Sequence, residues 1–116
     1  MKGKPFHTRA GFAIAGLRAA WSLEASFRTQ IAAALAALIL LMMLRPPAIW
    51  WALVLVVIAF VLAAELFNTA LEHLADHLHP EQHPKIRVAK DCAAAAVLVL
   101  SLAALGLSAL ILWQFL

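Results

Sequence analysis

Apolar positions along the chain form three long runs, and polar residues gather between them. Residues 29–44, 46–64 and 92–116 contain no charged side chain. Runs of this length are typical of membrane-spanning helices, because roughly 20 helical residues cross a hydrocarbon layer of ~30 Å. The first run gives only roughly 24 Å of helix, so we expect its helix to start earlier and to include Arg28, whose side chain can reach the interface. The pattern predicts spans at about 25–44, 48–72 and 92–115.

The segment before the first span has a different pattern. Residues 6–22 mix apolar side chains with arginines, which predicts an amphipathic helix lying on the membrane surface. A very short turn, Arg45-Pro46-Pro47, joins the first two spans. The longer connection at 77–91 is polar and contains two prolines, so we expect it to be non-helical and to lie in water or headgroups. The expected fold is an all-α membrane protein, one domain over 1–116 with three spans and a surface helix.

Composition and charge agree with a membrane protein and orient it. Hydrophobic residues make up 66% of the chain and charged residues 13%, whereas about a quarter is usual in soluble domains. Eight of the nine lysines and arginines precede the first span or lie between the second and third. This side is therefore expected to face the cytoplasm. A net charge of +3 suits an anionic membrane surface and does not indicate nucleic acid. All six acidic residues fall on the cytoplasmic side, so any chemistry is expected there.

Four polar residues, which we call the polar stripe, end the second span: Glu65, Asn68, Glu72 and Asp76. From Pro47 to Glu65 a helix rises roughly 27 Å, so Glu65 is expected near the inner edge of the hydrocarbon. At a spacing of i, i+3, i+7 and i+11, the four share one helix face within about 80° of arc. An ionisable group at lipid depth is costly and indicates function. We interpret Glu65 as a candidate general base, while Asp76 is better explained as the solvated end of a helix.

Two further charged sites, Glu24 and Lys90-Asp91, each allow two interpretations. Glu24 can pair with Arg28 one turn later, or it can join Glu72 in holding Mg²⁺, which usually takes one or two carboxylates plus phosphate oxygens. Lys90-Asp91 is expected at the start of the third span, where a lysine can meet a phosphate near a helix N-terminus. The alternative there is a lysine reaching the interface and an N-cap aspartate. The histidines at 73, 77, 79 and 83 lack the HExxH pattern of a zinc site, and no glycine-rich phosphate loop is present.

An ordered set of motifs resembles a known family. GLRAAW (16–21), ExxFR (24–28), ExxNxxxE (65–72) and AKD (89–91) are similar to the small prokaryotic diacylglycerol kinases, which include undecaprenol kinases. The resemblance covers nearly the whole chain. It implies a homotrimer in the bacterial cytoplasmic membrane, with active sites shared between subunits. It also implies that the γ-phosphate of MgATP passes directly to the hydroxyl of a membrane lipid.

The resemblance also implies roles for individual residues. Glu65 would be the general base, with Asn68 orienting the centre, and Glu24 and Glu72 would hold Mg²⁺. The implied ATP-binding residues are Phe12, Glu24, Glu72, Glu81, Gln82, His83, Lys90 and Asp91. The implied lipid-binding residues are Arg18, Trp21, Phe27, Arg28 and Gln30, together with Glu65. This chain departs from the family at Phe12-Ala13, where Tyr-Ser is common, at Gln30, where glutamate often occurs, and at Val88, where a basic residue often occurs.

The resulting expectation is a diacylglycerol kinase that makes phosphatidic acid. Phosphorylation of undecaprenol is the same chemistry on another lipid alcohol and stays open as the alternative. A different class, a small proton-coupled exporter, would also contain a membrane glutamate. Such exporters usually have four spans and no polar stripe that continues into water. Dependence on MgATP separates a kinase from an exporter and from a non-enzymatic assembly factor.

Overall fold

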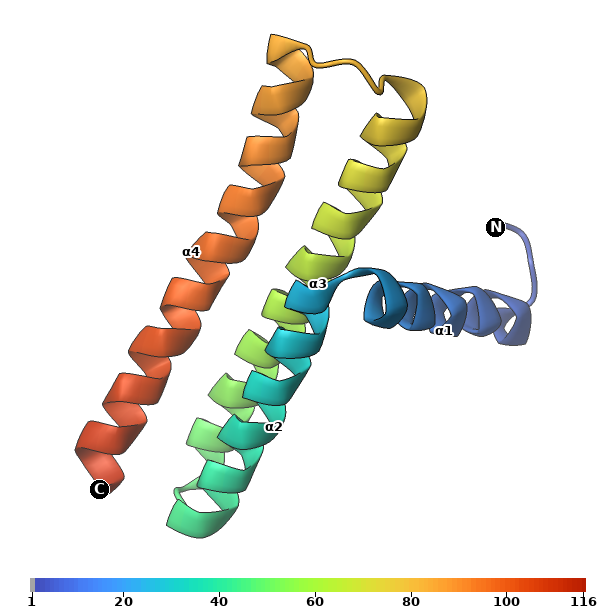
Figure 1. The fold of residues 1–116 in the computed structure, drawn as a ribbon. Coiled ribbons are helices and arrows are strands. Elements are labelled where there is room, and N and C mark those ends of the chain that lie inside the picture. The colour runs from blue at the N-terminus through green and yellow to red at the C-terminus, as the bar shows by residue number, and fades with distance from the viewer. Residues whose placement is uncertain (1) are drawn as a thin grey trace.

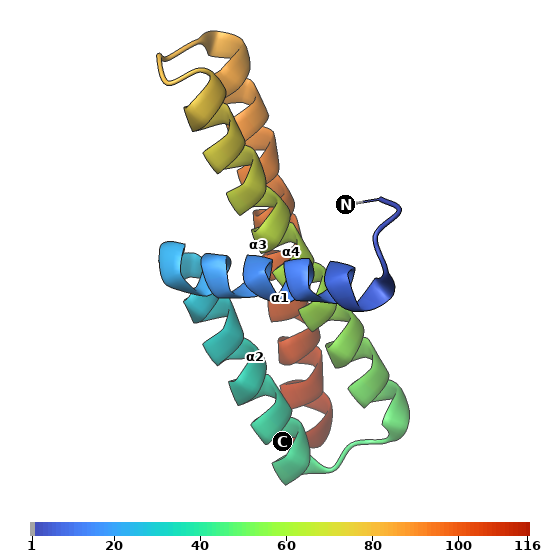
Figure 2. The same ribbon diagram turned by 90° about the vertical axis from the view of Figure 1, so that its right-hand side faces the viewer.

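A computed structural model describes residues 2–116 and contains four helices (Figure 1). The three later helices are each long and apolar enough to cross a membrane. They run alongside one another, while the first helix lies across them near the start of α2 (Figure 2). The predicted all-helical fold, with three candidate spans after a separate N-terminal helix, is confirmed. The helices are α1 (Phe6–Leu23), α2 (Ala25–Leu44), α3 (Ala48–Leu78) and α4 (Pro84–Phe115).

Two tight corners set the directions of the first three helices. Only Glu24, in an extended conformation with φ −123° and ψ 110°, separates α1 from α2. At the other end of α2, Arg45 has left-handed angles of φ 53° and ψ 52°, a common way to end a helix. Pro46 follows directly, and a proline disfavours helical angles at the residue before it. The first corner brings α1 across the bundle, and the second reverses the chain into α3.

The connection between α3 and α4 is shorter than predicted. Only residues 79–83 lie outside the helices, rather than 77–91. The sequence interpretation was wrong because Pro84 was treated as a break, whereas proline is well suited to the first position of a helix. The ring Nδ1 of His83 accepts a hydrogen bond from the Lys85 amide at 3.1 Å and caps this start. Lys90 and Asp91 therefore lie almost two turns inside α4, so Asp91 is not an N-cap and the helix N-terminus is not beside them.

A small apolar core holds the end of the bundle where α2 meets α3. Leu41, Val54 and Ile111, one from each of the three candidate spans, are buried together. Next to them the rings of Trp50 and Phe115 meet edge to face, with centroids 5.6 Å apart. Most other large apolar side chains face outward, as expected for helices surrounded by lipid or by other helices.

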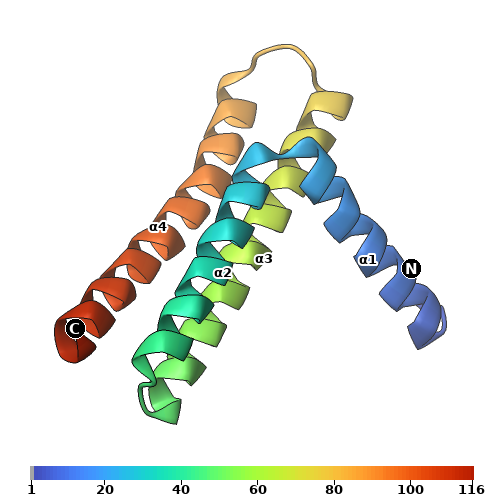
Figure 3. The same cartoon turned by 60° about the horizontal axis from the view of Figure 1, so that its bottom comes forward.

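The opposite end of the bundle is open and polar. Here α3 and α4 extend well past the level at which α2 begins, and α1 points away from them (Figures 1 and 3). The outer part of α3 contains most of the polar stripe, and the outer part of α4 contains Lys90 and Asp91. This end therefore has charged groups on α3 and α4, both at the level where α2 begins and farther out.

Candidate functional site

Glu65 is the most buried charged residue of the described chain, with 3% of its surface exposed. Both of its carboxylate oxygens face donors on α2. The Ser26 hydroxyl donates to Oε2 at 3.1 Å, and the Gln30 amide approaches Oε1 at 3.5 Å. Carboxylate oxygens accept hydrogen bonds, and these two neutral donors supply one to each oxygen. Unused lone pairs remain on both oxygens, which allows Glu65 to accept a proton from a substrate.

The polar stripe passes from buried to exposed along α3. Asn68 and Thr69 follow Glu65 by about one turn, and Thr69 is buried. Glu72 is half-buried and Asp76 is exposed. Within residues 2–116, the buried Oδ1 of Asn68 has no hydrogen-bond partner. A buried acceptor without a partner is unfavourable, so this oxygen has a free capacity to accept a hydrogen bond.

Glu24 faces α3 from the corner between α1 and α2. Its Oε1 lies 3.4 Å from Nε2 of His73, the residue after Glu72. The ion pair with Arg28 that the sequence left open does not form, because the Arg28 guanidinium donates to the carbonyl of Trp21 instead. Glu24 therefore reaches the stretch of α3 that contains Glu72, from the corner between α1 and α2.

These residues fit a magnesium ion bound together with a nucleotide. The part of the chain described contains no group of three or more His, Cys, Asp or Glu side chains arranged as a metal site. Mg²⁺ does not require one, since phosphate oxygens and water commonly complete its coordination. Glu24 and Glu72 supply carboxylates, and the unpartnered oxygen of Asn68 lies one turn away on the same face of α3.

Lys90 connects the outer part of α4 to the end of the polar stripe. Its ammonium group pairs with the carboxylate of Asp76 on α3. Asp91 instead pairs with Arg87 on its own helix, with 3.2 Å between Nε and Oδ1. Asp76 is thus more than a solvated helix end, because it holds the lysine that the sequence singled out for phosphate.

Within one chain, the predicted ATP-binding residues do not all line the same pocket. Glu81, Gln82, His83 and Lys90 line one pocket of about 560 Å³ at the 79–83 connection. Phe12 lines another pocket, with Arg9 and Ala13 of α1 and with Lys2. The structure therefore brings the loop residues and Lys90 together, and it does not bring Phe12 to them.

The predicted lipid-binding residues differ in accessibility. Trp21 is half-exposed on α1, and Arg18 is exposed on the same helix. Phe27 is only 3% exposed, so its ring packs inside the chain. Gln30 contacts Glu65, and Arg28 is tied to the carbonyl of Trp21. The corner between α1 and α2 therefore contains an accessible arginine and tryptophan above a buried phenylalanine.

Comparison with known proteins identifies the family. The family model for prokaryotic diacylglycerol kinase matches residues 11–112. The chain belongs to the prokaryotic diacylglycerol kinase family. It is 36% identical to the diacylglycerol kinase of Escherichia coli K12 over 105 residues, which cover 90% of this chain and 86% of that protein. The diacylglycerol kinase of Shigella flexneri gives the same values. The undecaprenol kinase of Bacillus subtilis is 35% identical over 76 residues, covering 66% of this chain and 62% of that protein.

Family membership implies a membrane lipid kinase that uses ATP. It accords with three helices able to span a membrane and with acidic residues gathered at one end of them. The names of the two kinds of relative differ in the lipid alcohol that is phosphorylated. The acceptor therefore has to be argued separately from the family.

Sequence reasoning missed several polar contacts in this kinase. Ser26 and Thr69 were not singled out, and neither was the contact of His73 with Glu24. Ser101 on α4, which accepts a hydrogen bond from Gln30, was also missed. A signal was present for Ser101, because Ser101 and Ser108 are the only hydroxyl residues in the apolar run 92–116 and are seven residues apart on one face.

Proposed function

We propose that this protein transfers the γ-phosphate of ATP to the primary hydroxyl of diacylglycerol, giving phosphatidic acid at the cytoplasmic face of a bacterial membrane. One observation carries the proposal. A buried carboxylate, Glu65, begins a polar face of α3 that continues to the exposed Asp76. The hydroxyl of a membrane lipid lies at the membrane edge and ATP lies in water. A polar face that connects these two depths allows them to react.

The reaction uses Glu65 as the general base. Its carboxylate takes the proton of the lipid hydroxyl while the hydroxyl oxygen bonds to the γ-phosphorus, and ADP leaves with the electrons of the broken P–O bond. Phosphoryl transfer depends mainly on positioning and on neutralisation of charge. Lys90 supplies a cation at the end of the stripe, and the pocket lined by Glu81 to His83 receives the nucleoside. Asp91, which pairs with Arg87, belongs to the same phosphate-binding end of the site.

Glu24 and Glu72 are the proposed magnesium ligands, and Asn68 orients the reacting groups beside them. Bound Mg²⁺ neutralises negative charge on the phosphate oxygens. The position of Glu24 against α3, beside His73, supports this assignment. Phe12 is assigned to ATP by resemblance alone. A homotrimer with sites shared between subunits would let Phe12 of one subunit serve a neighbouring pocket.

The lipid head is proposed to bind at the corner between α1 and α2. Arg18 and Trp21 are accessible there, Arg28 is held against Trp21, and Gln30 reaches Glu65. Phe27 shapes this corner from the inside. Undecaprenol, which also has a primary hydroxyl on an apolar chain, is the second candidate acceptor. The greater coverage of the diacylglycerol kinase relatives favours diacylglycerol.

The deciding experiment uses protein purified in mild detergent. Phosphorylation of diacylglycerol and undecaprenol is measured side by side, with and without MgATP, and Glu65→Gln is the control. Preferential turnover of diacylglycerol that disappears in the control supports the proposal. A preference for undecaprenol assigns the other acceptor. If folded protein phosphorylates neither lipid, the kinase proposal is wrong and proton-coupled transport is tested next.

A further inference from the structure

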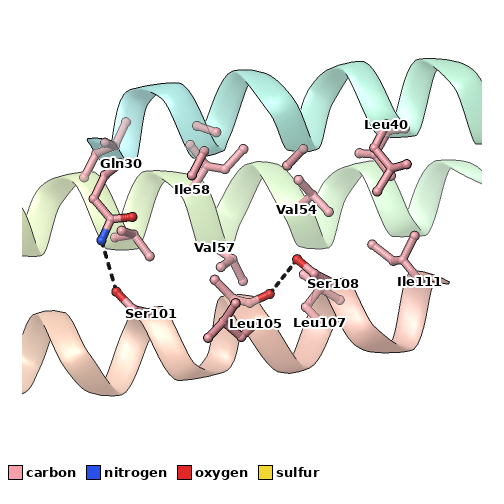
Figure 4. A pocket seen from close by; sticks show the side chains of 17 residues that line it. Gln30, Leu40, Val54, Val57, Ile58, Ser101, Leu105, Leu107, Ser108 and Ile111 are labelled. Atoms are coloured by element: carbon pink, nitrogen blue, oxygen red, sulfur yellow. Dashed lines mark hydrogen bonds between the residues drawn. The ribbon is translucent and has the colours of Figure 1, made fainter. Parts of the chain in front are cut away.

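A chain of hydrogen bonds from uncharged donors connects the buried carboxylate to α4. The Gln30 amide nitrogen donates to the Ser101 hydroxyl at 3.2 Å, joining α2 to α4 across 71 residues of sequence. Figure 4 shows the Gln30 side chain directed at Ser101. The same amide nitrogen lies 3.5 Å from Oε1 of Glu65 on α3. One amide group thus contacts both neighbouring helices.

The geometry fixes which way the Gln30 amide points. Because an ionised Glu65 only accepts, the amide must present its nitrogen to the carboxylate, and that nitrogen carries two hydrogens. The hydrogen that does not face Glu65 is free to bond Ser101. The Gln30–Ser101 contact is the shorter of the two, so the Gln30 amide is held between α3 and α4 by both acceptors.

Ser26 acts on the other oxygen of the same carboxylate. Its hydroxyl donates to Oε2 at 3.1 Å from the first turn of α2. Gln30 lies one turn later on the same helix, so the two donors approach Glu65 from one side. A carboxylate with a donor facing each oxygen has a preferred orientation, which a base requires in order to meet a substrate proton repeatedly.

We propose that Ser26 and Ser101 are positioning residues for Glu65, Ser26 directly and Ser101 through Gln30. The inference rests on the proposed kinase function. The two donors to the carboxylate, Ser26 and Gln30, are uncharged, so they orient it without placing a permanent positive charge beside it. Ser26 occupies a variable position of the ExxFR motif, and Ser101 lies outside all four motifs that carry the family resemblance.

Ser108 provides a matched control on α4. It lines the same cavity of about 290 Å³ as Gln30 and Ser101. Its hydroxyl, however, donates to the carbonyl of Ala104 at 2.8 Å, within its own helix (Figure 4). Ser108→Ala therefore removes a serine from the same helix and cavity without touching Glu65 or Gln30.

The test measures kcat, and KM for ATP and for diacylglycerol, on full-length protein in mild detergent. We expect Ser26→Ala to lower kcat about tenfold, with both KM values unchanged and with recovery in Ser26→Thr. We expect Ser101→Ala to lower kcat about threefold and Ser108→Ala to leave it unchanged. In a Gln30→Leu background, Ser101→Ala should have no further effect, because Ser101 acts through that amide. Size-exclusion profiles establish that each variant is folded.

Each contrary result has a distinct meaning. If Ser101→Ala lowers kcat equally with and without Gln30, or if Ser108→Ala matches it, the positioning role of Ser101 is overturned. If Ser26→Thr fails to recover kcat, the role of Ser26 is overturned. Wild-type protein that phosphorylates no lipid overturns the proposed function and this inference together. Active wild type with additive variants overturns the inference alone.

Discussion

The two ends of the helical bundle are built by opposite means. At the end where α2 meets α3, side chains of Leu41, Val54 and Ile111 pack with no polar group among them. At the other end, Glu65 is buried among neutral donors, and Lys90 reaches across to Asp76. The first end is stabilised by close packing, which is a main attractive interaction between helices in a membrane. The second end buries polar groups, which is costly unless each finds a partner.

This difference indicates a division of labour within a small protein. The apolar end fixes the relative positions of α2, α3 and α4. The polar end, which contains an unpartnered acceptor on Asn68, depends on those positions to bring its side chains together. Changes at the polar end are therefore expected to lower activity with little loss of stability. Changes at the apolar end are expected to lower stability with little loss of activity per folded molecule.

The largest effect is expected from Glu65→Gln. The amide cannot act as a base, so MgATP-dependent lipid phosphorylation should fall by about a thousandfold or more. The thermal midpoint in detergent should stay the same or rise, because a buried charge is removed. Radiolabelled phosphate transfer and thermal unfolding are measured on the same preparation. Residual turnover within tenfold of wild type would assign the base to another residue.

Glu72→Gln tests the proposed metal ligand. Turnover should fall about a hundredfold or more, and the Mg²⁺ concentration that gives half-maximal rate should rise. Glu24→Gln should change the magnesium dependence in the same direction. A titration of MgCl₂ at saturating ATP and lipid distinguishes a ligand from a residue that merely shapes the site. An unchanged magnesium dependence in both variants would exclude these carboxylates as the metal site.

Much of the fold was readable from the sequence, because water and lipid impose strong constraints. Uncharged runs of helix length predicted the spans, and the spacing of Glu65, Asn68 and Glu72 predicted one polar face of α3. The connection at 77–91 was misjudged because proline both ends helices and begins them, and local composition does not distinguish the two. Here the His83 ring accepts a hydrogen bond from the Lys85 amide and caps a helix that begins at Pro84.

Contacts between helices were the least predictable part of the site. A serine in an apolar helix usually bonds the carbonyl four residues earlier, as Ser108 does. Ser101 instead accepts from Gln30 because the Gln30 side chain reaches it from α2, and only the assembled bundle shows this. The pairing of Lys90 with Asp76 likewise depends on how α3 and α4 pack.

Lys90→Met and Asp76→Asn compare a proposed phosphate ligand with its partner. Loss of the ammonium group should lower turnover about a hundredfold and raise KM for ATP. Asp76→Asn should cost less, about tenfold or below, since the lysine remains and loses only its anchor. Steady-state kinetics with varied ATP measures both. A larger loss in Asp76→Asn than in Lys90→Met would make Asp76 the primary functional group of the pair.

Ile111→Ala tests the apolar end and is expected to have only a small effect on catalysis. Its side chain is 3% exposed between α2 and α3, and truncation of a buried isoleucine costs about 2–5 kcal/mol of stability. The thermal midpoint in detergent should therefore fall clearly, while kcat per folded molecule stays within about twofold of wild type.

Leu110→Ala is the matched control for this variant, since it is the preceding residue of α4 and its side chain is 59% exposed. It removes a similar apolar volume from the outside of the helix, so the thermal midpoint should change little. If Ile111→Ala lowers kcat as strongly as Ser101→Ala does, packing at the apolar end controls the carboxylate directly. The two ends would then act as one coupled unit, and the division between them would have to be abandoned.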